Sequence, residues 1–202
     1  FTAAHPANCD APDGSVAQGL ASITLKAGYN SVVTLTPDFA QGWSQVLTVT
    51  GDIQILSGSV AACGKVVNGV SGVGVTFNCA NLAVAAGAIL NADGKGFPAQ
   101  EGPLSPSGQS SGADTFNYGA SHGGRGYGIG ANTAWTYGSA INPVTLGAGG
   151  SSTTADGFNR SGGGAIKISA SGTVTINGRI SCNAHDRGFH NTGAGGSLQI
   201  SC

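Results

Sequence analysis

One short unit occurs twice near the end of the chain. Residues 163–169, Gly-Gly-Ala-Ile-Lys-Ile-Ser, return 32 positions later as Gly-Gly-Ser-Leu-Gln-Ile-Ser at 195–201. A second pair of segments, 91–97 and 183–189, aligns without a gap. Repetition of short strand-like pieces indicates stacked turns, each of which buries its apolar side on the next. The last copy ends at Cys202 within a strand, so we expect an uncovered edge that needs a cap or a partner.

The composition favours narrow strands joined by tight corners. Gly accounts for 36 of the 202 residues, against a usual share of ~7%, and charged residues make up only 8%, against ~25%. Val, Ile, Thr and Ala are plentiful beside the glycines. This mixture is typical of β-structure and differs from the charged composition of disordered chains.

Alternating apolar and polar residues predict short strands along most of the chain. They fall at 22–25, 32–36, 45–49, 52–56, 74–77, 82–84 and 88–90, and again within 163–202. Segment 80–92 is the best helix candidate, but its internal breaks and its similarity to 171–184 favour strand. We therefore predict an all-β fold. It consists of a short right-handed parallel β-helix over 61–202, preceded by a less regular β region over 1–60 that is a candidate for subunit contact.

Residues 98–162 differ from the flanking repeats. They are rich in Gly, Ser and Pro and have little periodicity, yet they contain aromatic residues, which flexible linkers rarely do. We predict an ordered insertion that lies against the β-helix, with glycines that let backbones approach closely. Tyr127, Trp135 and Tyr137 are candidates for carbohydrate binding, because exposed aromatic faces stack on sugar rings. The alternative is that these rings anchor the insertion.

Several glycine-rich pieces between residues 87 and 202 carry a resemblance. They are His122-Gly-Gly-Arg-Gly126, Tyr137-Gly-Ser139 with Pro143, Gly147-Ala-Gly-Gly150 and Gly162-Gly-Gly-Ala-Ile-Lys-Ile168, followed by a Gly-x-Ile-Ser strand. This series resembles glycine-rich parallel β-helix segments of large secreted and cell-surface proteins. The resemblance implies an extracellular, adhesive or structural role, and it does not extend to residues 1–60.

The cysteines indicate an oxidising compartment. None of the five lies in a CxxC pair, so disulfides are expected rather than a zinc site, and the odd number leaves one thiol free or bonded to another chain. The candidates are Cys9, Cys63, Cys79, Cys182 and Cys202. Asn159 begins the one N-glycosylation sequon. Because the chain starts at Phe1 without a methionine, we expect a processed product that is secreted or displayed at a cell surface.

No set of residues predicts catalysis, a metal site or a cofactor. Lys95 and Arg187 precede Gly-Phe in the two aligned segments and would suit a polysaccharide lyase, which also needs clustered acids for Ca²⁺. No two of the nine acidic residues lie within two positions of each other. His185, Asp186 and His190 offer two imidazoles and a carboxylate to a divalent metal, but a polar corner between strands is the simpler interpretation.

The expected partners follow from the charge. A net charge of −1 with no basic patch makes nucleic acid a poor partner, and no stretch is apolar for long enough to span a membrane as a helix. Low charge favours self-association. We therefore predict a structural, non-enzymatic protomer that stacks end to end into a fibre or surface layer, with residues 1–20 as a candidate strand for a neighbouring copy. The alternative is a carbohydrate-binding or polysaccharide-lyase-like β-helix module.

Overall fold

A computed structural model describes residues 2–3, 21–25, 32–35, 46–104, 119–126, 135–151, 160–185 and 192–202 of the chain. These residues form strands and no helix, which confirms the predicted all-β class. The strands lie in three larger sheets, here A, B and C, and one hairpin.

Each larger sheet takes one strand at a time from successive parts of the chain. Sheet A contains β1 (Thr2–Ala3), β2 (Ile23–Leu25), β5 (Ile53–Ile55), β10 (Leu82–Val84) and β13 (Val174–Ile176). Sheet B contains β3 (Val32–Leu35), β6 (Ser59–Ala62), β11 (Ile89–Asn91) and β14 (Arg179–Ser181). Sheet C contains β4 (Val46–Thr48), β9 (Val75–Cys79), β12 (Ala165–Ala170) and β15 (Ser197–Ser201).

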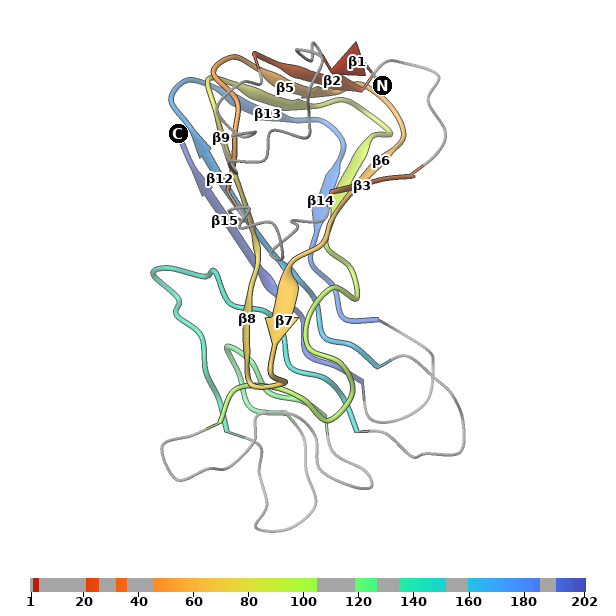
Figure 1. The fold of residues 1–202 in the computed structure, drawn as a ribbon, viewed down its shortest axis with the longest axis vertical. Helices are drawn as coiled ribbons and strands as arrows, with labels where there is room; N and C mark the ends of the chain where they lie inside the picture. Colours follow the sequence, from red (N-terminus) through yellow and green to blue (C-terminus); the bar gives the residue numbers. More distant parts are fainter. Residues whose placement is uncertain are drawn as a thin grey trace.

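The chain visits the sheets in the fixed order A, B, C, and we call each such visit a passage. The four passages are β2–β3–β4, β5–β6–β9, β10–β11–β12 and β13–β14–β15. Neighbouring strands from successive passages pair in parallel, whereas β1 pairs antiparallel with β2. Figure 1 shows the three sheets as three sides around a common core.

Among the corners that the structure describes, the longest join sheet B to sheet C. The corners from sheet A to B and from C to A contain two to four residues where the structure describes them. The B-to-C corners are longer: residues 63–74, 92–164 and 182–196. The first of these holds the antiparallel hairpin of β7 (Lys65–Val67) and β8 (Ser71–Val73), and the second holds the predicted insertion. Figure 1 shows the hairpin and the insertion extending from the same side of the molecule.

The register confirms one sequence repeat and corrects the other. Ile166 pairs with Leu198 and Ile168 with Ile200, as the alignment of 163–169 with 195–201 predicts. In the second pair of segments, Asn91 pairs with Ser181, two residues before the Asn183 that the ungapped alignment indicates. The cause is corner length, because four residues join β10 to β11 whereas two join β13 to β14.

The predicted boundary at residue 60 falls inside a strand. β6 pairs on one side with β3, which precedes residue 60 in the chain, and on the other side with β11, which follows it, so segments on both sides of the boundary contribute to the same sheet. At the start of the chain, β1 adds to the chain's own sheet A. Residues 1 and 4–20 of the candidate donor segment lie outside the described residues.

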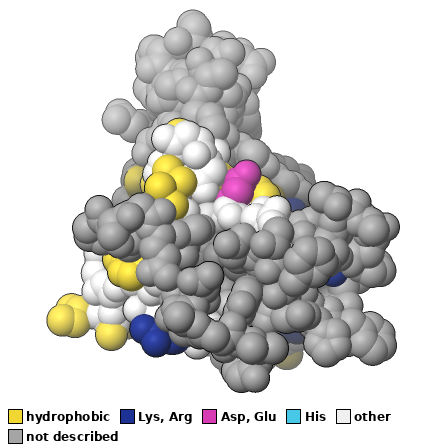
Figure 2. Space-filling model, turned by 90° about the horizontal axis from the view of Figure 1, so that it is seen from below, with side chains coloured by type: hydrophobic (Ala, Val, Ile, Leu, Met, Phe, Trp, Pro, Cys, Tyr) yellow, Lys and Arg dark blue, Asp and Glu magenta, His cyan; other side chains and the backbone are white. Residues whose placement is uncertain are grey.

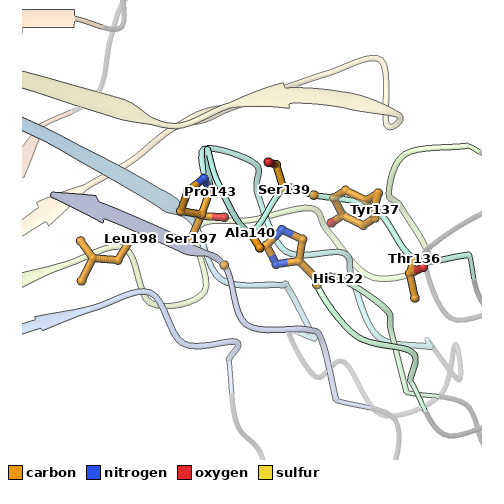
Figure 3. Close-up of a pocket in the computed structure, with 11 residues that line it drawn as sticks. His122, Thr136, Tyr137, Ser139, Ala140, Pro143, Ser197 and Leu198 are labelled. Carbon is orange, nitrogen blue, oxygen red and sulfur yellow. The ribbon is translucent and has the colours of Figure 1, made fainter. Parts of the chain in front are cut away.

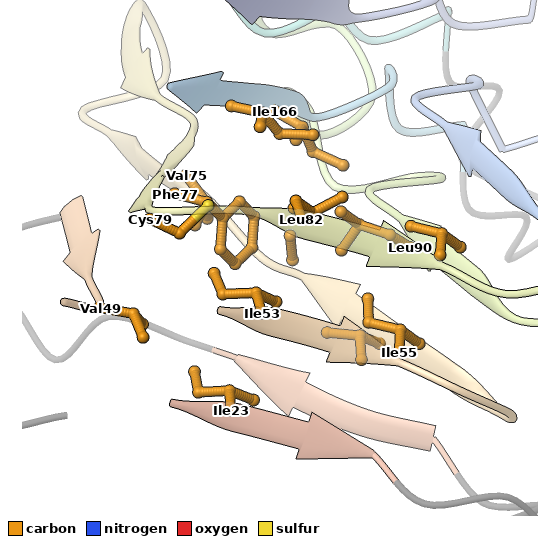
Figure 4. Close-up of a cluster of buried hydrophobic side chains, with 14 of the residues drawn as sticks. Ile23, Val49, Ile53, Ile55, Val75, Phe77, Cys79, Leu82, Leu90 and Ile166 are labelled. Atoms are coloured by element: carbon orange, nitrogen blue, oxygen red, sulfur yellow. The ribbon is translucent and has the colours of Figure 1, made fainter. Parts of the chain in front are cut away.

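The core consists of alternate side chains that point between the three sheets. Ile55, Phe77, Val84, Leu90 and Ile168 are each at most 2% exposed and come from all three sheets. Figure 4 shows the labelled members of this cluster directed toward one another. Full burial of each such side chain contributes about 1.5–3 kcal/mol. The buried apolar side chains between the sheets are therefore the main stabilising feature of the sheets.

A second layer in the B-to-C corners is built from backbones alone. The Phe97 N–H donates to the Gly147 carbonyl, Gly147 N–H donates to Gly163, and Gly162 N–H donates back to Phe97, at 2.8–3.0 Å. Three segments that all bond to one another cannot lie in one flat sheet, so they form a bundle. Ala194 continues it, because its N–H donates to Ala148 and its carbonyl accepts from Gly163.

Glycine is required in this bundle because the backbones touch. A Cβ on Gly162 would overlap the carbonyl oxygen of Gly147, and a Cβ on Gly163 would overlap that of Cys182. The same reason places glycine at the axis of the collagen triple helix. A small apolar cluster of Phe97, Leu146 and Ala165, with Val66 of the hairpin, joins the bundle to the sheets.

We predict that Gly162→Ala lowers the free energy of unfolding by about 3 kcal/mol or more, because the added methyl forces two hydrogen-bonded backbones apart. Gly123→Ala is the matched control, since a Cβ there has nothing within 4 Å. Its effect should stay within about 1 kcal/mol. Urea unfolding of both variants measures the difference, and equal stabilities would contradict the backbone-contact interpretation.

Candidate functional site

A pocket of about 370 Å³ lies where the insertion meets the last strand of sheet C. Three separate parts of the chain line it: His122 and Gly123, residues 136–140 with Pro143, and residues 196–198 at the start of β15. Figure 3 shows Leu198 and Pro143 toward one end of the lining and Tyr137 and Thr136 toward the other, with Ala140 and His122 between them. None of these lining side chains is an acid, a lysine or an arginine.

His122 is held by both ring nitrogens. Its Nδ1 lies 2.8 Å from the Gly195 carbonyl oxygen, and its Nε2 lies 2.7 Å from Oγ1 of Thr145. Because a carbonyl only accepts, Nδ1 carries the hydrogen, and Nε2 accepts from the Thr145 hydroxyl. Burial lowers the pKa of His122, which keeps the ring neutral at pH 7. His122 therefore ties the insertion to β15 and has no free nitrogen to act as a base.

The structure brings two of the three predicted aromatic residues together. The rings of Trp135 and Tyr137 stack at 6.2 Å with 20° between their planes, and His122 lies 4.9 Å from Tyr137. Tyr137 is only 9% exposed, and its hydroxyl donates to the Leu146 carbonyl. Burial raises the pKa of Tyr137 well above its usual range. Tyr137 thus forms a fixed wall of the pocket and also anchors the insertion, whereas Tyr127 lies outside the described residues.

Two serines at the pocket keep unused hydrogen-bonding capacity. Ser139 Oγ accepts from the backbone N–H groups of Ile141 and Asn142 at 3.3 and 3.1 Å, which leaves its hydroxyl hydrogen available. Ser197 donates its hydroxyl hydrogen to the Thr145 carbonyl at 2.7 Å, which leaves its oxygen available as an acceptor. No sequence pattern marks these serines or His122 as site residues. The only signal was their position in or beside the glycine-rich motifs.

Asp93 lies in the aligned segment 91–97 and bonds to Asn183, just before the predicted polar corner of His185, Asp186 and His190. Its carboxylate accepts from the Ser181 hydroxyl at 2.8 Å and from the Asn183 N–H at 2.7 Å, and Arg179 lies 3.7 Å away. Lys95 is exposed beside this corner. Across the described ranges, no three His, Cys, Asp or Glu side chains gather as a metal site would require. Asp186, Arg187 and His190 lie outside those ranges.

The last passage exposes apolar side chains that face the core in earlier passages. Ile176, Leu198 and Ile200 are 39–41% exposed. They pair with Val84, Ile166 and Ile168, which are fully buried. Within the described part of the chain, no strand pairs with the outer side of β13, β14 or β15. We call these three strands the C-terminal edge.

The four described cysteines are free thiols, so the expected disulfides are not present among them. They are Cys63, Cys79, Cys182 and Cys202. Cys79 pairs with Ala170 in sheet C, and Cys202 directly follows β15 on the far side of β12. Two strand spacings amount to about 9.6 Å, beyond the reach of a disulfide. Cys9 and the sequon residue Asn159 lie outside the described residues.

No family of known proteins, no curated protein and no solved structure matches this chain. In the described residues, no helix is both long enough and apolar enough to cross a membrane.

The thiols should differ in reactivity, because only the thiolate reacts. Burial raises the pKa of Cys182 to about 12, and burial together with the charge of Asp52 raises that of Cys79. Both groups therefore stay protonated at pH 7, whereas Cys202 is exposed. In a reaction with a chromogenic disulfide, we expect Cys202→Ser to remove one rapidly reacting thiol and Cys182→Ser to leave the rapid phase unchanged. An equal loss in both variants would contradict this assignment.

Proposed function

We propose that this chain is a parallel β-helix, or β-solenoid, that serves as an extracellular structural protomer and stacks end to end into a fibre or surface layer. The order of strands supports the β-helix: four passages through three parallel sheets around one core. In such a fold each passage is one coil, and each coil covers the apolar side chains of the one before it.

The C-terminal edge is the observation that carries the proposal. It presents unpaired strand edges together with the exposed side chains of Ile176, Leu198 and Ile200. A further coil would pair with these strands at about 4.8 Å and cover those side chains, which contributes roughly 1 kcal/mol for each. The occupant we propose is a second copy of this chain.

The opposite end of the stack offers a surface of the same kind. β3 and β4 each have one outer side without a partner strand in the described residues, and β1 lies on the outer side of β2. In the proposed contact, β3 and β4 of one copy pair with β14 and β15 of the next, and β1 meets β13. Because the two surfaces differ, the contact is head to tail and repeats without closing, which generates a filament.

The charge distribution does not oppose this association. The net charge is −1, and Figure 2 shows scattered charged side chains with no patch of one sign on the coloured part of that face. Close approach of identical copies therefore costs little electrostatic energy. The lyase alternative has weaker support, because the Asp93 carboxylate already accepts hydrogen bonds from Ser181 of β14 and from Asn183 just after it.

We predict that the chain forms filaments that Ile176→Asp abolishes, because the new carboxylate would be buried at the contact without a partner. Thr175→Asp is the matched control, since Thr175 is exposed on the same strand but alternates to the outer face. Electron microscopy and analytical ultracentrifugation measure assembly, and thermal unfolding confirms that both variants fold.

Other results of these measurements would overturn or change the proposed contact. A wild-type chain that stays monomeric under oxidising and reducing conditions would overturn the fibre proposal. Filaments that persist in Ile176→Asp but disappear in Thr175→Asp would move the contact from the C-terminal edge to the outer face of sheet A. A ladder on a non-reducing gel that disappears in Cys202→Ser would indicate that the contact is also covalent.

A further inference from the structure

We infer that the pocket between the insertion and β15 binds a neutral saccharide through a single sugar residue or a short chain of them. This inference rests on the pocket alone and holds whether or not copies of the chain assemble. Four observations carry it: the absence of charge, the arrangement of hydroxyl groups, the apolar contacts and the rigidity of the walls.

The absence of charge selects the ligand class. Among the described residues that line the pocket, none is an acid, a lysine or an arginine, and burial holds His122 in its neutral form. An anionic or cationic ligand would lose its hydration here without gaining an opposite charge. A ligand that fits this pocket is therefore neutral.

The hydroxyl groups match a ligand that carries several hydroxyls of its own. Ser139 has a free hydroxyl hydrogen to donate, and Ser197 has a free oxygen to accept. Thr136, which is exposed at the pocket, offers a further hydroxyl that both donates and accepts. Donors and acceptors at separate points of one pocket suit the hydroxyl groups around a sugar ring.

Apolar atoms complete the surface. Pro143 and Leu198 line the part of the pocket away from Tyr137 and contribute apolar side chains to it (Figure 3). Sugar rings carry C–H groups between their hydroxyls, so they bind where apolar and polar atoms alternate. The volume of about 370 Å³ is near the lower end of the usual range of about 300–1,000 Å³ for ligand pockets. It therefore suits a small ligand.

The walls are fixed before any ligand binds. Both nitrogens of His122 are hydrogen-bonded, and the Tyr137 hydroxyl is bonded to the backbone of Leu146. Ser139 holds its own loop by accepting two backbone N–H groups. A preformed pocket spends less binding free energy on ordering side chains, which matters most for small ligands.

The test measures binding of neutral monosaccharides, namely glucose, galactose, mannose and N-acetylglucosamine, with glucuronate as the charged comparison. Titrations of the full chain followed by NMR should show at least one neutral sugar with a Kd on the order of 1 mM. The shifted backbone signals should include those of Ser139, Ala140 and Ser197, and glucuronate should bind about tenfold more weakly than glucose or not at all.

Ala140→Trp is the blocking variant, because Ala140 lines the pocket and is exposed, so a larger side chain fills the space without disturbing the core. It should weaken binding about tenfold or more. Ile141→Ala is the matched control: Ile141 is the next residue, is 92% exposed and does not line the pocket. Its Kd should equal that of the wild type. If Ala140→Trp does not fold, Thr136→Ala takes its place with an expected loss of a few-fold.

Three results would overturn the inference. The first is that none of the neutral sugars binds the wild-type chain. The second is that glucuronate binds as tightly as glucose, which would contradict selection by the uncharged lining. The third is that a folded Ala140→Trp variant, or Thr136→Ala in its place, binds as well as the wild type, which would locate the sugar elsewhere.

Discussion

Direct contact between backbones is the constraint on which this structure depends. In the three sheets it takes the usual form of parallel strand pairing, with side chains directed alternately into the core and away from it. In the second layer the backbones bond in several directions at once, which leaves no room for side chains at Gly147, Gly162 and Gly163. The abundance of glycine is thus a packing requirement. The low charge agrees with it, because long charged side chains have no place between touching backbones.

The sequence was informative where a repeat lies within strands. Residues 163–169 and 195–201 each consist of a strand and the two residues before it. Their alignment therefore predicts the observed pairing of β12 with β15. The alignment of 91–97 with 183–189 extends beyond a strand into the following corner, and it missed the pairing of β11 with β14 by two residues. Likeness between these two segments therefore does not report strand register.

The candidate site was only partly predictable. The aromatic residues of the insertion were notable as a set, and the structure brings Trp135 and Tyr137 together. The contact between His122 and Gly195 spans 73 positions, and neither residue has a periodic pattern that marks it. Ser139 and Ser197 gain meaning only through the carbonyl and N–H groups they meet. Local sequence cannot reveal a pocket whose lining converges from three distant segments.

The long segments in the described part of this molecule are concentrated at the B-to-C corners. At the other described corners, the length varies only between two and four residues, and the strands that follow still pair in parallel. At the B-to-C corners the chain leaves the three sheets, forms the β7–β8 hairpin or the backbone bundle, and returns to sheet C in register. The three sheets therefore act as a fixed scaffold, and the segments at the B-to-C corners can differ in length and shape. The pocket lies on the side of the molecule that these segments form.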